Sequence, residues 1–298
     1  MVSHSSRRAN ATILIQIHAK NEKSLQKIID AHVHMSESRD DALIRFAQMN
    51  GLRYTMDELL NTMRRYGITR GLLLSPPLKG DAILPNEKII ALCKESDGLL
   101  SPVLTVEPAS KDVKAAIKLA DLNRKEIKAF KVRLGYINAS AESPVFRVLY
   151  DYAESENLPV LFHTGDTAFS TGDLVRSHPL TLDKLANERE RLTIILCHFG
   201  NPWFDDVAEL IYKHPNVYAD ISGLITPSDA YADKFMEWLA RKISEAVYYA
   251  GGAEKVIFGT DYPVTTHKET LALVSRLEIE EGDKEKILWR NAERVFRL

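Results

Sequence analysis

The stretch Ile29-Asp-Ala-His-Val-His34 decides between the two folds that the rest of the chain allows. It belongs to the first of eight β-rich runs that alternate with segments of helical periodicity, a pattern typical of parallel βαβ units. An open doubly wound sheet would usually carry a glycine-rich phosphate-binding turn after its first strand. This stretch carries two histidines instead. We therefore predict an α/β protein with a (β/α)8 TIM barrel in a single domain.

The predicted elements cover the chain from Lys27 onward. We expect strands at residues 27–34, 71–74, 99–104, 129–134, 158–163, 192–198, 217–221 and 256–260. We expect helices at 57–66, 87–96, 111–122, 145–156, 182–189, 204–213, 233–249 and 268–276, with a closing amphipathic segment at 284–296. Barrels of this kind usually need about 250 residues. The domain would thus span residues 27–298, after a short N-terminal extension at residues 1–26.

The composition favours a globular protein that acts on small molecules. The chain has 298 residues, 45% of them hydrophobic, and a formal net charge of -2. No strongly basic stretch indicates nucleic-acid binding, and the apolar runs are shorter than the ~18 residues of a membrane span. Cys93 and Cys197 lie far apart, which fits a reducing, cytoplasmic location better than a disulfide framework. A homo-oligomer stays open, because the loop at 34–55 could contact a second subunit.

Polar side chains collect in the first predicted strand. Successive residues of a strand point to opposite sides, so Asp30, His32 and His34 should share one face, with apolar residues on the other. Burying three polar groups without partners is costly. A metal ion would satisfy both imidazoles at once.

Three further predicted strands end on titratable residues: His163, His198 and Asp261. In a parallel barrel all carboxyl ends of strands meet at one mouth, where barrel enzymes place their chemistry. The convergence predicts a metal site with four ligands, His32, His34, His163 and Asp261. Three nitrogens and one oxygen suit zinc. We expect one ion, and two ions stay open.

The fourth predicted strand sends two cations toward the barrel axis. Phe130, Val132 and Leu134 should face the helices, which leaves Lys131 and Arg133 pointing inward. Arg133 could bind a substrate carboxylate through its planar guanidinium. Lys131 could carry a carbamate that bridges two metals. Alternatively, either cation pairs with Asp30 or another acid.

Other candidates have plainer interpretations. Trp203, close after His198, could line the pocket for substrate or pack under the barrel rim. The remaining histidines are expected to be solvated or capping side chains: His4, His18, His178, His214 and His267.

Five motifs together resemble the amidohydrolase superfamily. They are Ile29-Asp-Ala-His-Val-His34, Leu161-Phe-His-Thr-Gly165, His198-Phe-Gly-Asn-Pro-Trp203, Asn216-Val-Tyr-Ala-Asp-Ile-Ser-Gly223 and Ile257-Phe-Gly-Thr-Asp-Tyr-Pro263. The chain is most similar to the branch with aminocarboxymuconate-semialdehyde decarboxylase, resorcylate decarboxylases and pyrone-dicarboxylate lactonase. The resemblance implies a distorted barrel, the same four metal ligands, and a His198 that either binds no metal or binds a second one. Lys131 stands where binuclear relatives carry a bridging lysine.

The predicted activity is metal-dependent hydrolysis of an amide, ester or lactone in a small carboxylated substrate. A metal ion lowers the pKa of a bound water toward neutrality. Asp261 would take the proton of that water, and His198 would help to polarise the carbonyl. Two alternatives stay open: a metal-dependent non-oxidative decarboxylase of an aromatic or muconate-like acid, and a barrel that binds metal without catalysis.

Overall fold

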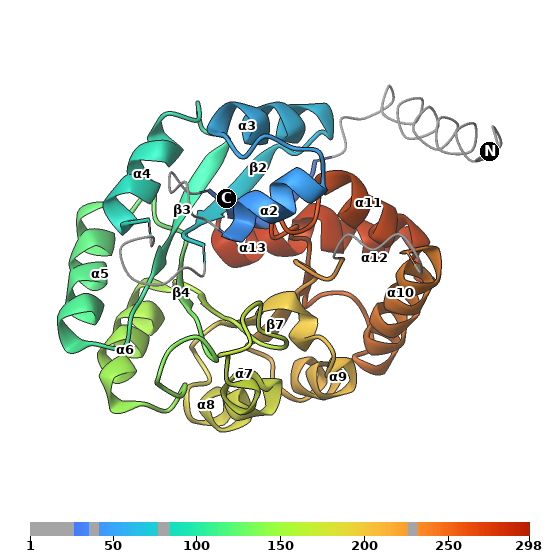
Figure 1. Cartoon of the computed structure of the whole chain (residues 1–298). Coiled ribbons are helices and arrows are strands. Elements are labelled where there is room, and N and C mark those ends of the chain that lie inside the picture. Colours follow the sequence, from blue (N-terminus) through green and yellow to red (C-terminus); the bar gives the residue numbers. More distant parts are fainter. Residues whose placement is uncertain (1–26, 36–41, 77–83, 226–231) are drawn as a thin grey trace.

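The computed structural model describes residues 27–35, 42–76, 84–225 and 232–298. Eight parallel strands follow one another in sequence order from β1 to β8, and helices form a ring outside them (Figure 1). The strands are β1 (Ile29–His34), β2 (Arg70–Leu74), β3 (Leu100–Thr105), β4 (Ala129–Val132), β5 (Val160–Phe162), β6 (Ile194–Leu196), β7 (Val217–Asp220) and β8 (Val256–Ile257). The predicted (β/α)8 TIM barrel is confirmed. The predicted extension lies outside the described residues.

The helices alternate with the strands. The longer ones are α2 (Ala42–Met49), α3 (Met56–Arg65), α4 (Asn86–Lys94), α5 (Ser110–Leu122), α6 (Arg147–Glu156), α9 (Phe204–Lys213), α10 (Ala232–Tyr249) and α11 (His267–Arg276). Shorter segments are η2 (Pro144–Phe146), α7 (Leu174–Ser177), η3 (Pro179–Leu182), α8 (Asp183–Glu188), η4 (Cys197–Gly200), α12 (Glu281–Glu285), η5 (Lys286–Arg290) and α13 (Asn291–Phe296).

Backbone hydrogen bonds join the segment after β8 to β1. The Asp261 N–H donates to the His32 carbonyl at 2.7 Å, and the His34 N–H donates to the Tyr262 carbonyl at 2.8 Å. These bonds bring the two ends of the barrel together. They also hold Asp261 beside the two histidines of β1.

Two apolar layers stabilise the barrel. The larger one lies between strands and helices and contains Phe130, Val132 and Leu134, the side chains predicted to face outward from the fourth strand. The smaller one contains Leu161 and other alternate strand residues, together with Phe296 of α13. The closing helix therefore packs against the residues that fill the barrel axis.

A shift in the pairing of β1 with β2 changes which side chains of β1 face the axis. Ile29 and Ala31 belong to the interior apolar layer, yet His32 and His34 line the cavity at the mouth. Asp30 points instead toward α11, where its Oδ2 atom lies 3.3 Å from Nε2 of His267, the first residue of that helix. The prediction that Asp30 shares a face with the histidines is wrong, because strict alternation ends at such an irregularity.

Two of the histidines expected to be solvated or capping are buried. His267 is 1% exposed and His214 is 4% exposed. Each has an acid beside it: Asp30 Oδ2 lies 3.3 Å from His267 Nε2, and Asp183 Oδ1 lies 2.8 Å from His214 Nε2, to which it is hydrogen-bonded. The third described one, His178, caps η3 as expected. His4 and His18 lie outside the described residues.

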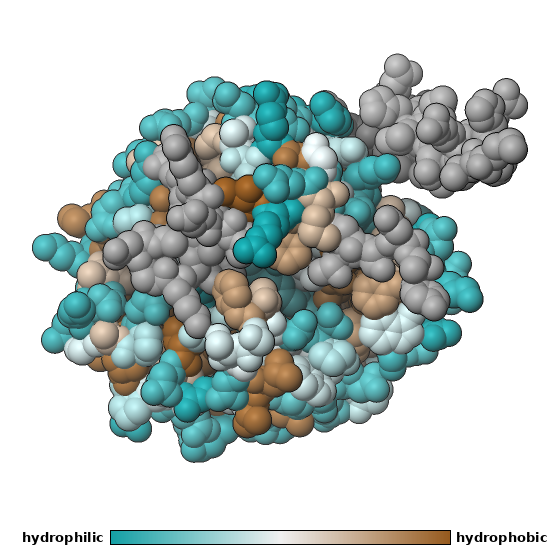
Figure 2. Space-filling view, viewed as in Figure 1, coloured by the Kyte–Doolittle hydropathy of each residue, from teal (hydrophilic) through white to brown (hydrophobic). Residues whose placement is uncertain are grey.

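Hydrophilic residues prevail around the rim of the face that contains α2, whereas hydrophobic residues are exposed near α7 (Figure 2). Leu174 and Val175 of α7 are 46% and 78% exposed. Within the described ranges, no helix is both long and apolar enough to cross a membrane.

Candidate metal centre

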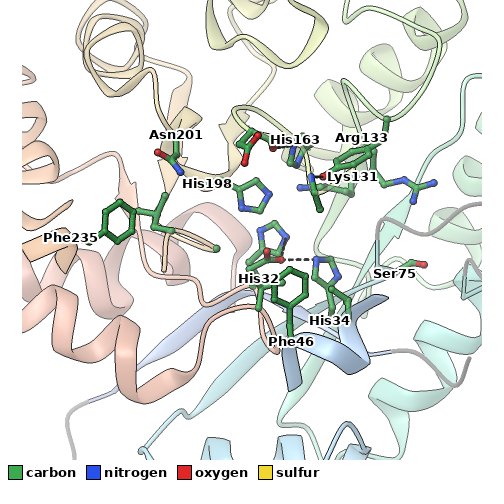
Figure 3. Close-up of a pocket in the computed structure, with 18 residues that line it drawn as sticks. His32, His34, Phe46, Ser75, Lys131, Arg133, His163, His198, Asn201 and Phe235 are labelled. Atoms are coloured by element: carbon green, nitrogen blue, oxygen red, sulfur yellow. Dashed lines mark hydrogen bonds and ion pairs between the residues drawn. The ribbon is translucent and has the colours of Figure 1, made fainter. Parts of the chain in front are cut away.

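A cavity of about 250 Å³ lies at the carboxyl ends of the strands. One wall is polar and brings together residues from strands far apart in sequence: His32, His34, Lys131, Arg133, Tyr136, His163, Asp166, His198, Asn201 and Asp261. The rest is largely apolar: Leu43, Phe46, Leu224, Phe235 and Val264. Figure 3 shows His32 between His198 and His34, with Phe46 drawn close to them and Phe235 set apart on the left, below Asn201.

Three of the four predicted ligands converge. The Asp261 Oδ1 atom lies 2.9 Å from His34 Nε2 and 3.5 Å from His32 Nε2. All three offer ligand atoms within 4.8 Å of one another. The geometry therefore places two nitrogens and one carboxylate oxygen around one point.

The hydrogen bonds of His32 leave its inward nitrogen with a lone pair. His32 Nδ1 donates to Asp220 Oδ2 at 3.0 Å. Its Nε2 atom is buried and has no hydrogen-bond partner. An accepting nitrogen without a donor is costly to bury, and a metal ion satisfies it. A carboxylate behind a metal-binding imidazole is a common way to fix the ring in this tautomer.

His34, like His32, has a nitrogen with a free lone pair that points into the cavity. Its Nδ1 atom donates to the Leu74 carbonyl at 3.1 Å, so a neutral ring has a lone pair at Nε2. That lone pair faces the Asp261 carboxylate. Two acceptors so close repel unless a proton or a metal ion lies between them. The residues present therefore fit a divalent cation.

The protonation states suit metal binding. Burial lowers the pKa of His32, of His163 and, to about 4, of His198. Burial opposes ionisation of Asp261, but the nearby histidines hold its pKa below the usual range. Neutral imidazoles and an ionised carboxylate are the forms that bind metal.

His163, the fourth predicted ligand, lies near His32, His34 and Asp261, but its Nε2 atom is bonded to a backbone carbonyl. The His163 ring lies 4.8 Å from the His198 ring, between centroids. Its Nε2 atom donates to the Asp166 carbonyl at 2.9 Å. To bind through Nε2, His163 would have to exchange that carbonyl for the ion.

His198 lies beside His32, with ring centroids 5.0 Å apart. Its Nδ1 atom is 3.1 Å from the Ser222 carbonyl, to which it must donate. The Nε2 atom of the neutral ring is then an acceptor. His198 lies two residues after the end of β6, where its left-handed backbone, with φ 61°, turns the ring into the cavity.

The two predicted inward cations both line the cavity. Lys131 Nζ donates to Cys197 Sγ at 2.8 Å. The Arg133 guanidinium points away from the histidines (Figure 3). It pairs with Glu107 and donates to the Pro76 carbonyl at 3.2 Å. The sequence left two roles open for Arg133, binding a substrate carboxylate and pairing with an acid of the protein. The structure shows the second, with Glu107 as the acid.

Trp203 is half-buried and is not among the residues around the cavity. Its ring packs on His178, with centroids 4.5 Å apart. The packing interpretation fits this placement, and a contact with substrate would need a substrate that extends beyond the cavity.

Asp220 is a site residue that our sequence reasoning missed. It is fully buried at the end of β7 and accepts from the His32 ring, from the His198 N–H at 2.9 Å and from the Ser222 N–H at 3.1 Å. Burial opposes its ionisation, but the contacts with His32 lower its pKa. The signal was available, because Asp220 lies near the carboxyl end of the predicted strand at 217–221, as His163 and Asp261 lie near the ends of theirs.

Gly223 leaves room for the site. A Cβ atom there would lie 2.7 Å from Asp261 Oδ2 and 2.9 Å from His198 Nδ1. Its φ of +65° also disfavours other residues. This glycine therefore permits the close approach of Asp261 and His198.

The family model named Amidohydrolase matches residues 29–298, nearly the whole chain that contains this site. The chain belongs to the amidohydrolase family. The resemblance drawn from the motifs is thus confirmed, and the protein is an enzyme of a superfamily whose members use divalent metals. No curated protein sequence matches the chain.

Solved structures share this fold at low identity. A TIM-barrel protein from Bordetella bronchiseptica is 22% identical with a TM-score of 0.71, over 91% of this chain and 98% of its own. A probable 2-pyrone-4,6-dicarboxylic acid hydrolase from Acinetobacter baumannii, with citric acid bound, is 17% identical with a TM-score of 0.65, over 91% and 99%. A dihydroxybenzoic acid decarboxylase from Polaromonas, with manganese and 2-nitroresorcinol bound, is 14% identical with a TM-score of 0.65, over 92% and 97%.

Proposed function

We propose that this amidohydrolase is a metal-dependent hydrolase that cleaves an amide, ester or lactone bond in a small carboxylated substrate. One observation carries the proposal: His32 Nε2, His34 Nε2 and Asp261 Oδ1 meet at one point, where the buried His32 Nε2 has no hydrogen-bond partner. We propose His32, His34, His163 and Asp261 as the ligands and zinc as the ion. Because manganese is bound in the Polaromonas enzyme, activity should also be measured with other divalent ions.

A divalent ion bound there would supply a Lewis acid that makes water acidic and polarises a carbonyl. Asp261 would then take the proton of the attacking water and pass it to the leaving group. Its low pKa makes it a carboxylate at neutral pH. It lies within reach of a molecule in the cavity, which it lines.

His198 would orient the water. Its Nδ1 atom is committed to Ser222, so Nε2 can accept a hydrogen bond but cannot donate one. With its pKa lowered to about 4, the ring stays neutral at neutral pH. We therefore assign His198 to the water, in place of the carbonyl contact expected from sequence.

Charge supports a carboxylated substrate. Lys131 and Arg133 are 3% and 4% exposed and line the same cavity. Because Glu107 already neutralises Arg133, Lys131 contributes most of the unbalanced positive charge. We propose that Arg133 orients the far end of the substrate, where its contacts with Glu107 would hold the guanidinium in place.

Non-oxidative decarboxylation is the second candidate. Phe46 and Phe235 line the same cavity as the histidines, and their apolar surface would suit an aromatic ring. The Polaromonas neighbour is named as such a decarboxylase.

Incubating the metal-loaded enzyme with lactones, esters and amides of dicarboxylic acids, and with hydroxylated benzoates, separates the candidates. Acid produced without carbon dioxide supports hydrolysis, and carbon dioxide release supports the second candidate. Turnover that persists in an Asp261→Asn variant would contradict the proposed role of this carboxylate in either reaction.

A further inference from the structure

A second cavity, of about 270 Å³, lies at the amino ends of β2, β3 and β4, on the side of the barrel opposite the metal centre. We call it the basal cavity. Four basic side chains and one acidic side chain line it: Arg70, Lys94, Lys125, Lys128 and Glu126. Among the residues that the structure describes, the basal cavity therefore carries an excess of positive charge.

Arg70, the first residue of β2, is a cation without a partner. It is half-buried, and in the described part of the chain it forms neither a hydrogen bond nor a salt bridge. A partly buried charge is costly without a counter-charge. The guanidinium group presents several N–H donors in a planar fork, which matches the paired oxygens of an anion.

Two neighbouring groups line the same cavity. Ser101 of β3 is 7% exposed, and no described residue is hydrogen-bonded to its hydroxyl. Lys128, the residue before β4, donates from Nζ to the Arg297 carbonyl at 3.3 Å. Burial and the charge of Arg70 lower the pKa of Lys128. The two cations therefore lie close enough to repel each other.

The ends of helices account for only part of this charge. α4 ends at Lys94, where the helix dipole favours a cation, and Lys94 also lies 3.9 Å from Glu126. Arg70 and Ser101 belong to strands, so neither caps a helix. The C-terminal carboxylate of Leu298 forms no salt bridge with any residue of the described ranges.

We propose that the basal cavity binds a phosphate group. Arg70 holds two of its oxygens with the guanidinium fork. Ser101 donates its hydroxyl to a third oxygen, and Lys128 supplies further positive charge. The phosphate is either the free ion or part of a small ester, because both present the same oxygens. The proposal is independent of the metal centre and of the reaction proposed there.

Titration calorimetry of the metal-loaded protein tests this with two probes, inorganic phosphate and glycerol 3-phosphate, each compared with sodium chloride at the same ionic strength. We expect both probes to bind more tightly than chloride, with an affinity that falls as salt increases. They should also raise the melting temperature, because only the folded protein has the site. The probe that binds more tightly identifies the free ion or an ester as the ligand.

Variants assign the site, since a metal ion can also bind phosphate. Arg70→Gln should lower the affinity for phosphate at least about tenfold, because it removes charged hydrogen bonds. The His32→Ala/His34→Ala protein keeps the basal cavity and should still bind phosphate. Arg64→Gln, which changes an exposed arginine of α3 outside this cavity, should bind phosphate as the wild type does.

Three results would overturn the proposal. The first is that neither probe binds more tightly than chloride. The second is an Arg70→Gln protein that binds phosphate as tightly as the wild type. The third is binding that is lost in His32→Ala/His34→Ala but kept in Arg70→Gln, which would assign the phosphate to the metal. If Arg70→Gln melts far below the wild type, Lys128→Met takes its place in the same titrations and comparisons.

Discussion

Asp220 connects three parts of the site through one buried carboxylate. It accepts from the His32 ring at 3.0 Å and from the His198 N–H at 2.9 Å. An Asp220→Asn variant can keep the shape but weakens the bond that fixes the His32 tautomer. We expect its affinity for the metal to fall by about 10–100-fold.

A competition titration against a chelator measures that affinity. Asp205→Asn is the control, because Asp205 is an exposed partner of Lys242 on the surface. Equal metal affinity in Asp220→Asn and wild type would contradict the role given to Asp220.

Gly223 offers a cleaner separation of site from fold. Gly223→Ala places a Cβ 2.7 Å from Asp261 Oδ2, whereas Gly251→Ala has a similar positive φ and nothing within 4 Å. Both should lose about 1–2 kcal/mol of stability from the left-handed backbone. Only Gly223→Ala should lose bound metal and activity. Chemical denaturation and metal analysis of both variants test this, and equal metal content would contradict it.

Sequence patterns predicted which side chains lie close together where the geometry follows from topology alone. His32, His34 and Asp261 meet because parallel strands all end at one mouth. Patterns could not predict that Asp30 leaves the axis or that His163 donates to the Asp166 carbonyl. Both depend on a local shift of register or a single loop conformation, for which no residue type is diagnostic.

At the scale of elements, α13 stabilises the barrel from its interior layer. Phe296 is 2% exposed and packs with the side chains along the axis. Phe296→Ala should lower the free energy of unfolding by about 3–5 kcal/mol through lost burial and the cavity left behind. Urea denaturation measures this. Val148→Ala, on an α6 side chain that is 54% exposed, is the control and should change stability by less than about 0.5 kcal/mol. A similar small change in Phe296→Ala would contradict the packing role of α13.

The eight predicted strands all appear, because each is an apolar run flanked by helical segments. Several ends differ by a few residues; β8 ends at Ile257, whereas the prediction reached residue 260. The predicted closing helix at 284–296 is instead divided among α12, η5 and α13. Periodicity shows which face of a segment is buried, but it cannot show a change from α to π hydrogen bonding within it.

At the scale of the molecule, the histidine cluster should make the metal-free protein sensitive to acid. The folded state lowers the pKa of His198 from 6.5 to about 4 and also lowers those of His32 and His163. At pH values between about 4 and 6.5, the unfolded chain binds more protons than the folded one. The stability of the folded state therefore falls as the pH decreases through this range. The lowered pKa values of Asp220 and Asp261 add a further loss only below their ordinary value of 3.8.

Urea denaturation of metal-free protein at several pH values from 7.5 to 4.5 should show this decrease, since each shifted pKa unit corresponds to about 1.4 kcal/mol. A His198→Asn variant should show a smaller decrease. A stability that is constant across this range would contradict the burial of neutral histidines.

We propose that β1 and the turn after β8 hold a catalytic metal ion. The most direct test is metal analysis of protein purified without chelator, beside a His32→Ala/His34→Ala variant that is shown to be folded. We predict about one divalent ion per chain in the wild type and none in the variant. Metal content that is the same in both proteins would contradict the account.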